Sequence, residues 1–321
     1  MRANLNKSFL SHRTARKSFA IAYVIAAAVL IAAIILATVS NVSSSLFQVR
    51  KRVAKIRAMQ LAEAGCIEGA ERLRAYMRKG GLDGNVHNDI AWQGPFVAKK
   101  ILSDPAQEFS VTVSISDEGS RLPLNYIDDL DKAYWIGLHE EGMLDAQPEV
   151  LWDRIADYID PDADMRLHGD ESHAKNKAIA SPAELALFDL PLKDRQFFDA
   201  EYTVYAEDAR VNINTIPAET LKALLAILRE KISLRSNAID TIVKRRLGDD
   251  EKEGTDDDGY FVSDEWTSFL SGLGPFKKVI DARFKVTSSI FRVSCTVTSK
   301  DASSELSATY DLANEKFLSF S

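Results

Sequence analysis

The sequence predicts an α+β protein in which one very long N-terminal helix packs on a small antiparallel sheet, with a large all-α domain inserted into that sheet. Three observations lead to this fold class. An apolar segment near the N-terminus continues into an amphipathic helix, alternating strand patterns occur early and late in the chain, and a block of about 150 residues with helical signals separates them.

The strongest local signal is the apolar segment Phe19–Val39, which holds no charged residue, Pro or Gly over its 21 residues. As a helix it is about 30 Å long, which matches the hydrocarbon core of a bilayer. It exceeds the apolar core of about 7–15 residues in a cleaved secretory signal. The sequence therefore predicts one membrane span. Basic residues before it favour a cytoplasmic N-terminus, although five more follow it; they are Arg2, Lys7, Arg13, Arg16 and Lys17, then Arg50, Lys51, Arg52, Lys55 and Arg57.

Helical spacing continues beyond the apolar segment. Apolar residues recur at intervals of three or four from Leu46 to Ile56 and again from Ile67 to Met77. Gly80-Gly81 then indicates a helix end. These patterns predict one helix over about residues 19–78, whose second half is amphipathic and must pack on something.

A partner sheet is predicted by alternation of apolar and polar residues. The pattern covers residues 109–116, 291–298 and 306–312, and the loop SKDASS between the last two runs favours an antiparallel hairpin. Between residues 125 and 278 the signals are helical. One example is Ser181–Glu184, a capping box with Pro at the first helical position.

The stretch VNINTIPAETLKALL, from Val211 to Leu225, indicates a strand end that leads into a helix, with Thr215 as the N-cap. Such runs open helix-hairpin-helix modules, many of which bind DNA. Residues 58–321 hold 30 basic and 47 acidic residues, a net charge of −17 that repels phosphate backbones. The connection ILREKISLRSNA also lacks the Gly of a DNA-binding hairpin. Asn212 and Asn214 are therefore interpreted as turn and capping residues.

Candidate chemistry is sparse. Phosphate-loop, dinucleotide and nucleophile-elbow motifs do not occur in the sequence, and LHEEGM has Met143 where a zinc-binding HExxH motif needs its second His. Alternating Asp160, Asp162 and Asp164 could wrap Ca²⁺, whereas a solvated acidic loop is the interpretation that spacing alone favours. Cys66 and Cys295 fall on facing surfaces of the helix and a strand, and form either a disulfide or two buried free thiols.

Six segments in a fixed order resemble the type II secretion minor pseudopilin K (GspK) family, and together they cover most of the chain after the apolar segment. The segments are AMQLAEAGCIEGA, DEGSRLPLN, ADYIDPDAD with HGDES, NKAIASPAEL, VNINTIPAETL, and KRR followed by GYFVSDEW. The resemblance implies a pilin-like fold with a helical domain inserted in its sheet. It divides the chain into a basic prepilin-type leader (1–18), a transmembrane helix (19–40), a pilin-like helix with the first strands (41–124), the inserted domain (125–278) and the closing strands (279–321).

The resemblance also implies a function without enzymatic activity at the tip of a periplasmic pseudopilus that supports export of folded proteins. The implied location is the bacterial inner membrane, with the N-terminus cytoplasmic and the bulk of the chain periplasmic. The implied partners are minor pseudopilins I and J, the major pseudopilin, the inner-membrane assembly platform and the prepilin peptidase, with no nucleic acid. The alternatives are a type IV pilus or DNA-uptake minor pilin that uses the helix-hairpin-helix-like unit, and a single-span periplasmic hydrolase.

Individual residues follow from the resemblance. Cleavage by the prepilin peptidase is expected between Ser18 and Phe19, although the usual Gly is replaced by Ser18. Tyr23 stands at the fifth mature position, where most pilin-like subunits carry Glu. A tip subunit has no neighbour above it to pair with such a carboxylate, so an aromatic residue is expected there. Calcium in the helical domain of the family supports Asp160, Asp162 and Asp164 as ligands.

Overall fold

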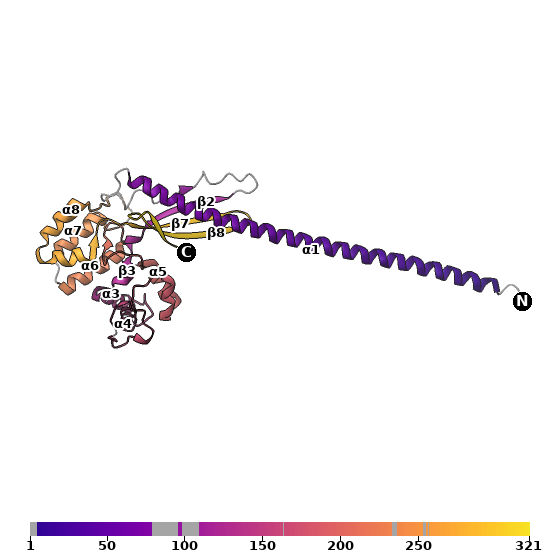
Figure 1. Cartoon of the computed structure of the whole chain (residues 1–321), viewed down its shortest axis with the longest axis horizontal. Helices are drawn as coiled ribbons and strands as arrows, with labels where there is room; N and C mark the ends of the chain where they lie inside the picture. Colours follow the sequence, from indigo (N-terminus) through magenta and orange to yellow (C-terminus); the bar gives the residue numbers. More distant parts are fainter. Residues whose placement is uncertain are drawn as a thin grey trace.

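The computed structural model describes residues 5–78, 96–97, 109–162, 164–232, 236–252, 255 and 257–321, with side chains from residue 22 onward except at 96–97, 232 and 236. One long rod extends from a head that holds all the other elements (Figure 1).

The rod is helix α1, Leu5–Met77, of 73 residues. The predicted C-terminal boundary is confirmed, whereas the helix begins well before residue 19; Gly80-Gly81 lies outside the described residues. The side chains from Ala22 to Val53 are all exposed, and burial on one face starts at Ala54. Within the part of the chain that the structure describes, α1 is the one helix long and apolar enough to cross a membrane.

The sheet has the strand order β1-β2-β7-β8-β9 and is antiparallel throughout. Its register pairs Val113 with Cys295, and Cys295 with Leu306. The predicted hairpin is confirmed as β7 and β8, whereas β9 was not predicted. The bounds are β1 Phe96–Val97, β2 Ser110–Asp117, β7 Ile290–Thr298, β8 Ser303–Asp311 and β9 Lys316–Phe320.

The second half of α1 lies across β2, β7 and β8 at unusually close range. A Cβ atom built on Gly65 would lie 2.3 Å from Cys295 Sγ, and one on Gly69 would lie 2.5 Å from Val293 Cγ1. The small side chains of the buried helix face therefore bring the helix backbone close to the sheet. The core between them consists of Ala58, Ala62, Cys66, Ala70, Leu73, Met77, Phe109, Val111, Val113, Ile115, Phe291, Val293, Cys295, Val297, Ala308 and Tyr310.

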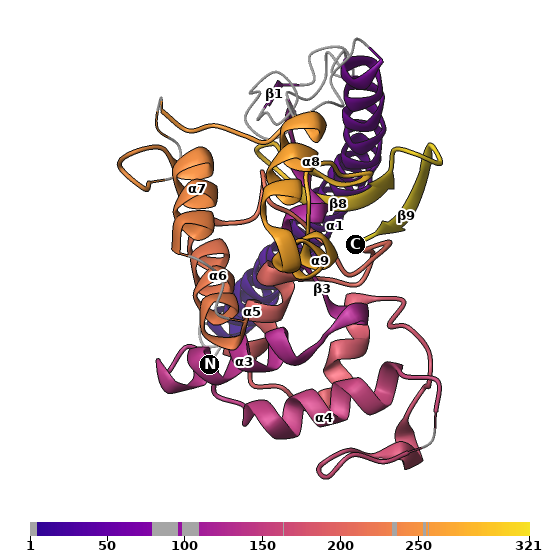
Figure 2. The same cartoon turned by 90° about the vertical axis from the view of Figure 1, so that its left-hand side faces the viewer.

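The chain between β2 and β7 forms an inserted domain at the end of the sheet away from the N-terminus (Figures 1 and 2). Its helices separate into a lobe of α3, α4 and α5 and a lobe of α6 to α9 (Figure 2). The helices are α3 Asp129–Glu140, α4 Pro148–Ile159, α5 Leu192–Glu201, α6 Ala218–Ile232, α7 Ser236–Leu247, α8 Ser263–Gly272 and α9 Lys277–Arg283; the 3-10 turns are η2 Glu118–Ser120, η3 Leu124–Tyr126, η4 Glu171–His173, η5 Pro182–Phe188 and η6 Gly274–Phe276.

The inserted domain has its own apolar core, which extends from Leu122 to Val286 and is separate from the core under α1. The domain therefore exceeds the expected limits of 125–278 at both ends. It is also not purely α-helical, because two pairs of short parallel strands close it. The pairs are β3 Leu122–Pro123 with β4 Tyr202–Thr203, and β5 Val211–Asn212 with β6 Phe284–Lys285.

A buried ion pair fastens the end of the inserted domain to its beginning. The guanidinium of Arg283 donates two hydrogen bonds to the carboxylate of Asp131, at 3.0 and 2.8 Å. Tyr202 donates to the same carboxylate at 3.1 Å, and Trp135 donates to the Tyr202 hydroxyl at 2.7 Å. Because the pair is two-pronged and its carboxylate accepts a third hydrogen bond from Tyr202, it fixes α9 against α3, although the buried Arg283 Nε has no hydrogen-bond partner among the described residues.

Candidate functional site

The VNINT stretch lies at the junction between the sheet and the inserted domain. Asp117, the last residue of β2, is buried and accepts hydrogen bonds from Asn212 Nδ2 (2.9 Å), Thr215 Oγ1 and Ser288 Oγ (2.8 Å), and from the backbone of Gly119 (2.7 Å). Burial raises the pKa of Asp117 against the opposing effect of these four donors. The two chain connections of the inserted domain and the VNINT turn therefore meet at one carboxylate.

Asn214 makes a second junction within the inserted domain. Its side chain donates to the backbone oxygens of Phe261 (2.9 Å) and Val286 (3.2 Å) and accepts from the backbone N–H of Phe261 (2.8 Å). Asn212 accepts from the backbone N–H of Asn214 at 3.0 Å, which closes the turn. Both asparagines are 1% exposed. Their interpretation as turn residues is confirmed, and neither side chain can reach a nucleic acid.

The expected N-cap at Thr215 is wrong. Helix α6 begins at Ala218, and its first backbone bond runs from Leu221 N–H to the carbonyl of Pro217. The Thr215 hydroxyl donates to Asp117 instead. Asp117 lies 98 residues from Thr215 in the sequence, yet its carboxylate takes the hydrogen bond that was expected to cap the helix. A buried carboxylate is costly unless donors satisfy it, and Thr215 is one of those donors.

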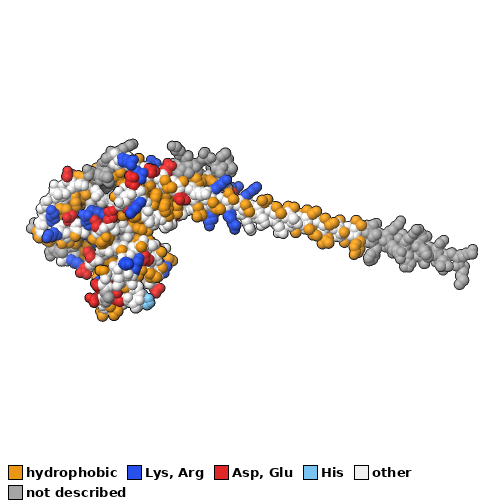
Figure 3. Space-filling model, viewed as in Figure 1, with side chains coloured by type: hydrophobic (Ala, Val, Ile, Leu, Met, Phe, Trp, Pro, Cys, Tyr) orange, Lys and Arg blue, Asp and Glu red, His pale blue; other side chains and the backbone are white. Residues whose placement is uncertain are grey.

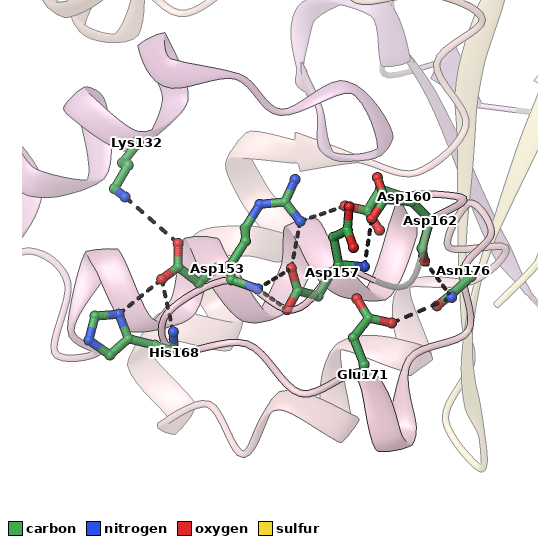
Figure 4. A network of polar contacts seen from close by, with 10 residues as sticks. Lys132, Asp153, Asp157, Asp160, Asp162, His168, Glu171 and Asn176 are labelled. Atoms are coloured by element: carbon green, nitrogen blue, oxygen red, sulfur yellow. Dashed lines mark hydrogen bonds and ion pairs between the residues drawn. The ribbon is translucent and has the colours of Figure 1, made fainter.

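The acidic loop after α4 is the candidate cation site (Figure 4). Asp157, fully buried at the end of α4, accepts from the backbone N–H of Arg166 at 3.1 Å and from its guanidinium. The same guanidinium nitrogen also donates to Asp160. Burial lowers the pKa of Arg166, but the hydrogen bonds to Asp160 and Asp157 raise it above its ordinary value. Arg166 thus holds the loop back against its helix.

The three expected ligands occupy different positions in this loop. Asp160 Oδ2 accepts from Arg166, whereas Asp160 Oδ1 is buried and accepts no hydrogen bond from the described residues. The carboxylate of Asp162 accepts from the backbone N–H of Asp164 at 2.9 Å. The side chain of Asp164 is exposed. The alternating aspartates therefore do not converge as a set.

Two residues from the following segment complete the cluster instead. Asn176 Nδ2 donates to the carbonyl of Asp162 at 2.8 Å and to Glu171 Oε2 at 3.5 Å. Glu171 Oε1 and Asn176 Oδ1 are buried and, like Asp160 Oδ1, accept no hydrogen bond from the described residues. Figure 4 shows Asp160, Asp162, Glu171 and Asn176 gathered at one end of the loop. Three unsatisfied oxygens in one acidic cluster are an energetic liability that a cation would remove.

The electrostatics agree with that inference. Burial raises the pKa of Glu171 and the hydrogen bond from Asn176 lowers it, while the nearby carboxylates of Asp157, Asp160 and Asp162 raise it further. No three His, Cys, Asp or Glu side chains among the described residues form a metal-binding group by themselves. Two carboxylate oxygens and one amide oxygen nevertheless form a donor set of the hard type that Ca²⁺ prefers, and backbone carbonyls can complete it. By their chemistry, the unsatisfied oxygens of Asp160, Glu171 and Asn176 are of a type that would suit a hard cation.

Sequence spacing could not identify Glu171 and Asn176, because they come from a segment that returns to the loop only in the folded chain. One local signal exists in the structure. Asn176 has φ of 50°, a left-handed conformation that is uncommon outside Gly and that Asn tolerates best. This conformation turns the Asn176 side chain toward the loop.

The cysteines lie together in the core under α1. Cys66 and Cys295 are both buried free thiols. The Cys66 Sγ lies 3.6 Å from the backbone oxygens of both Val293 and Leu306, and its single S–H can donate a weak hydrogen bond to either. Burial raises the pKa of Cys66 to about 12 and that of Cys295 to about 11. Neither thiol is therefore a nucleophile at neutral pH.

The expected processing residues lie on the rod. The side chains of Ser18 and Phe19 lie outside the described residues, although the backbone there is helical. Tyr23 is 76% exposed on the apolar part of α1. Tyr23 stands at the fifth mature position, where the resemblance implies an aromatic residue in place of the usual Glu.

The comparisons with known proteins agree with this arrangement. No protein-family model matches the sequence, and no curated protein matches it. Among solved structures, the chain superposes on a chain of the crystal structure of the GspK-GspI-GspJ complex from the type 2 secretion system of enterotoxigenic Escherichia coli, with a TM-score of 0.59 and 15% identity. The match covers 85% of this chain and 96% of that chain.

A long N-terminal helix laid on an antiparallel sheet defines the class of pilin-like subunits. Within that class, the domain inserted between β2 and β7 and the extent of the superposition show that the chain has a GspK-like minor pseudopilin fold.

Proposed function

We propose that this chain is a non-enzymatic minor pseudopilin that occupies the tip of a type II secretion pseudopilus. The single observation that carries the proposal is the position of the inserted domain at the end of the sheet away from the N-terminus (Figure 1). In a fibre whose subunits align their N-terminal helices, this is the end on which a further subunit would stack. The inserted domain therefore blocks extension sterically, and the chain fits the first position of the fibre.

The long helix supplies the surface for assembly below the tip. On the part of α1 that follows the apolar segment, large apolar side chains remain exposed, including Leu46, Phe47, Val49, Val53 and Ile56. Exposed apolar stripes of this extent mark interaction surfaces. The partners we propose for it are minor pseudopilins I and J and the major pseudopilin, with α1 anchored in the inner membrane and the head in the periplasm. The prepilin peptidase and the assembly platform are its proposed processing and assembly partners.

Calcium has a structural role in this proposal. The ion would bind Asp160, Glu171 and Asn176, satisfy their three buried oxygens and hold the loop after α4 against η4. Trp152 offers a direct readout, because the Arg166 guanidinium lies 5.5 Å from the centre of its ring. Terbium added to the full-length protein should luminesce on excitation of tryptophan, calcium should displace it, and Glu171→Gln should abolish the signal. Asp164→Asn is the matched control, since that side chain is exposed, and it should keep the signal. Equal signals in the two variants would refute the ligand set.

The steric role can be tested by removing the insertion. Asp117 and Phe291 are direct partners in the β2–β7 register, so a short turn can replace residues 118–289 without opening the sheet. The shortened chain should no longer support secretion of folded periplasmic proteins and should allow further subunits to add above it. Full-length protein should co-purify with the minor pseudopilins I and J encoded in the same genome. Normal secretion in a deletion strain, with pseudopili of normal length, would refute the proposal.

The nucleic-acid alternative gains no support from the geometry. The two asparagines that give the VNINT stretch its DNA-binding appearance are buried among backbone carbonyls and Asp117. Salt-sensitive binding of duplex DNA by the full-length protein at low ionic strength would reopen that alternative.

A further inference from the structure

A ring of basic side chains surrounds α1 where the rod approaches the head. Its members are Arg50, Lys51, Arg52 and Lys55, all exposed, and together they are called the basic collar. Figure 3 shows these blue side chains projecting from the rod, beyond a long stretch that is orange and white. The first acidic residue of the whole chain is Glu63, so residues 1–62 offer the collar no acidic partner. Four cations in six residues make this a strongly basic surface.

The position of the collar along the helix identifies the anion. The chain is free of charge from Phe19 to Val49, and Arg50 follows Phe19 by about 46 Å at 1.5 Å per residue. A helix tilted by about 20° spans about 44 Å of that distance along the membrane normal. A bilayer with its headgroups is about 40–45 Å thick. The collar therefore begins where the headgroups of the far leaflet end.

The side chains of the collar point back toward that leaflet. In an α-helix every Cα–Cβ bond tilts toward the N-terminus, and long side chains extend over the preceding turn. Lys51 shows this directly, because its ammonium lies 4.8 Å from the centre of the Phe47 ring, one turn nearer the membrane span. Lys and Arg commonly extend their stems along apolar surface in this way while the charged head stays in a polar layer.

We propose that the basic collar binds the phosphate groups of anionic phospholipids in the far leaflet, and so fixes how deeply the subunit sits before it enters the fibre. The proposal rests on the membrane anchoring of the proposed function. Each cation near an anionic surface strengthens binding severalfold. The collar then acts as a stop: because burial on α1 starts at Ala54, within the same stretch, it holds the head directly at the membrane surface, and it must leave the lipid when the subunit is extracted.

The test uses the full-length chain in a mild detergent, with native mass spectrometry to count bound phosphatidylglycerol or phosphatidylcholine of matched acyl chains. The wild-type protein should bind phosphatidylglycerol about tenfold more tightly or better. R50Q/K51Q/R52Q/K55Q should lose that preference. The conservative variant K51R/K55R should keep it. K244Q/K277Q/K278Q, which removes exposed cations from the inserted domain, should also keep it.

Three outcomes overturn the proposal: no preference in the wild-type protein, an unchanged preference in the collar variant, or displacement of the lipid by inorganic phosphate at constant ionic strength, which would indicate a free-phosphate site. Loss of pseudopilin co-purification by the collar variant with lipid preference intact would assign the collar to an acidic protein surface instead. Carbonate extraction of membranes tests the membrane span separately from the lipid preference of the collar. Release of the wild-type chain would refute the membrane span, whereas retention without lipid preference refutes the collar alone.

Discussion

Replacing Gly65 with alanine places a methyl group into the contact between α1 and β7. The new Cβ would lie 2.3 Å from Cys295 Sγ and 3.3 Å from Val113 Cγ2, so the thiol must move by more than an ångström within a packed core. Overpacking costs about 1–3 kcal/mol, and an overlap as severe as this one should cost about 2–3 kcal/mol, in the upper part of that range. The better helix propensity of alanine returns about 1 kcal/mol. We expect a net destabilisation of about 1–2 kcal/mol for Gly65→Ala.

The position offers both a rescue and a control. Cys295→Ala removes the sulfur that the new methyl group would strike, so in Gly65→Ala with Cys295→Ala the two changes should compensate, with a favourable coupling of about 1–2 kcal/mol. Gly137→Ala is the matched control. It lies within α3, a Cβ there has no heavy atom within 4 Å, and the substitution should stabilise the protein by up to about 1 kcal/mol.

Hydrogen exchange of the β2 and β7 amides, followed by mass spectrometry on the full-length protein, measures the effect at the sheet. For 1–2 kcal/mol, exchange should be about 5- to 30-fold faster in Gly65→Ala. It should return toward the rate of the Cys295→Ala protein in the double variant. Unchanged exchange in Gly65→Ala, or strictly additive effects in the double variant, would refute close packing of α1 on the sheet.

Three further predictions follow from the buried groups. Asp117→Ala leaves four donors without their acceptor and should lower stability by about 3 kcal/mol or more in a thermal unfolding experiment. Asp117→Asn should lower it less, and equal unfolding midpoints for the two variants would refute the role of Asp117 as the acceptor at this junction. Cys66 and Cys295 should react with a thiol reagent at pH 8 only after unfolding, because burial raises both pKa values, and rapid labelling of the native protein would contradict this. The raised pKa of Glu171 means that its protonation favours the folded loop, so without calcium this contribution is complete below the unfolded pKa and is lost as the pH rises through the folded value. Calcium titrations should accordingly show weaker binding at acid pH, and an affinity that stays constant from neutral pH to well below pH 5 would exclude Glu171 as a ligand.

The parts of the fold that follow from sequence are those with sustained periodicity. Helix α1 and the β7–β8 hairpin each repeat an apolar pattern long enough to specify both the element and its buried face. The parallel pairs β3–β4 and β5–β6 are two residues long and carry no period. They form because the inserted domain brings their segments together.

The same reasoning explains the candidate cation site. The aspartate spacing indicated the loop beside which three buried oxygens lack hydrogen-bond donors among the described residues, and Asp160 remains a proposed ligand. Glu171 and Asn176 could not be predicted from the spacing, because they come near the loop after α4 only once the chain has turned at η4. Thr215 was misassigned for a related reason, since its partner Asp117 is local only in the folded chain.

The β2–β7 pairing has a consequence for the order in which the chain can fold. These strands are neighbours in the sheet, yet the whole inserted domain lies between them in the sequence. Closing so long a loop is entropically unfavourable while it is disordered. Folding of the inserted domain first brings Asp117 and Ser288 within hydrogen-bonding distance, and the sheet can then complete itself as a local event. Until the C-terminal strands have been made and have paired, the apolar face of α1 that packs on β7 and β8 remains uncovered, and that interval is when a chaperone or another subunit would have access to it.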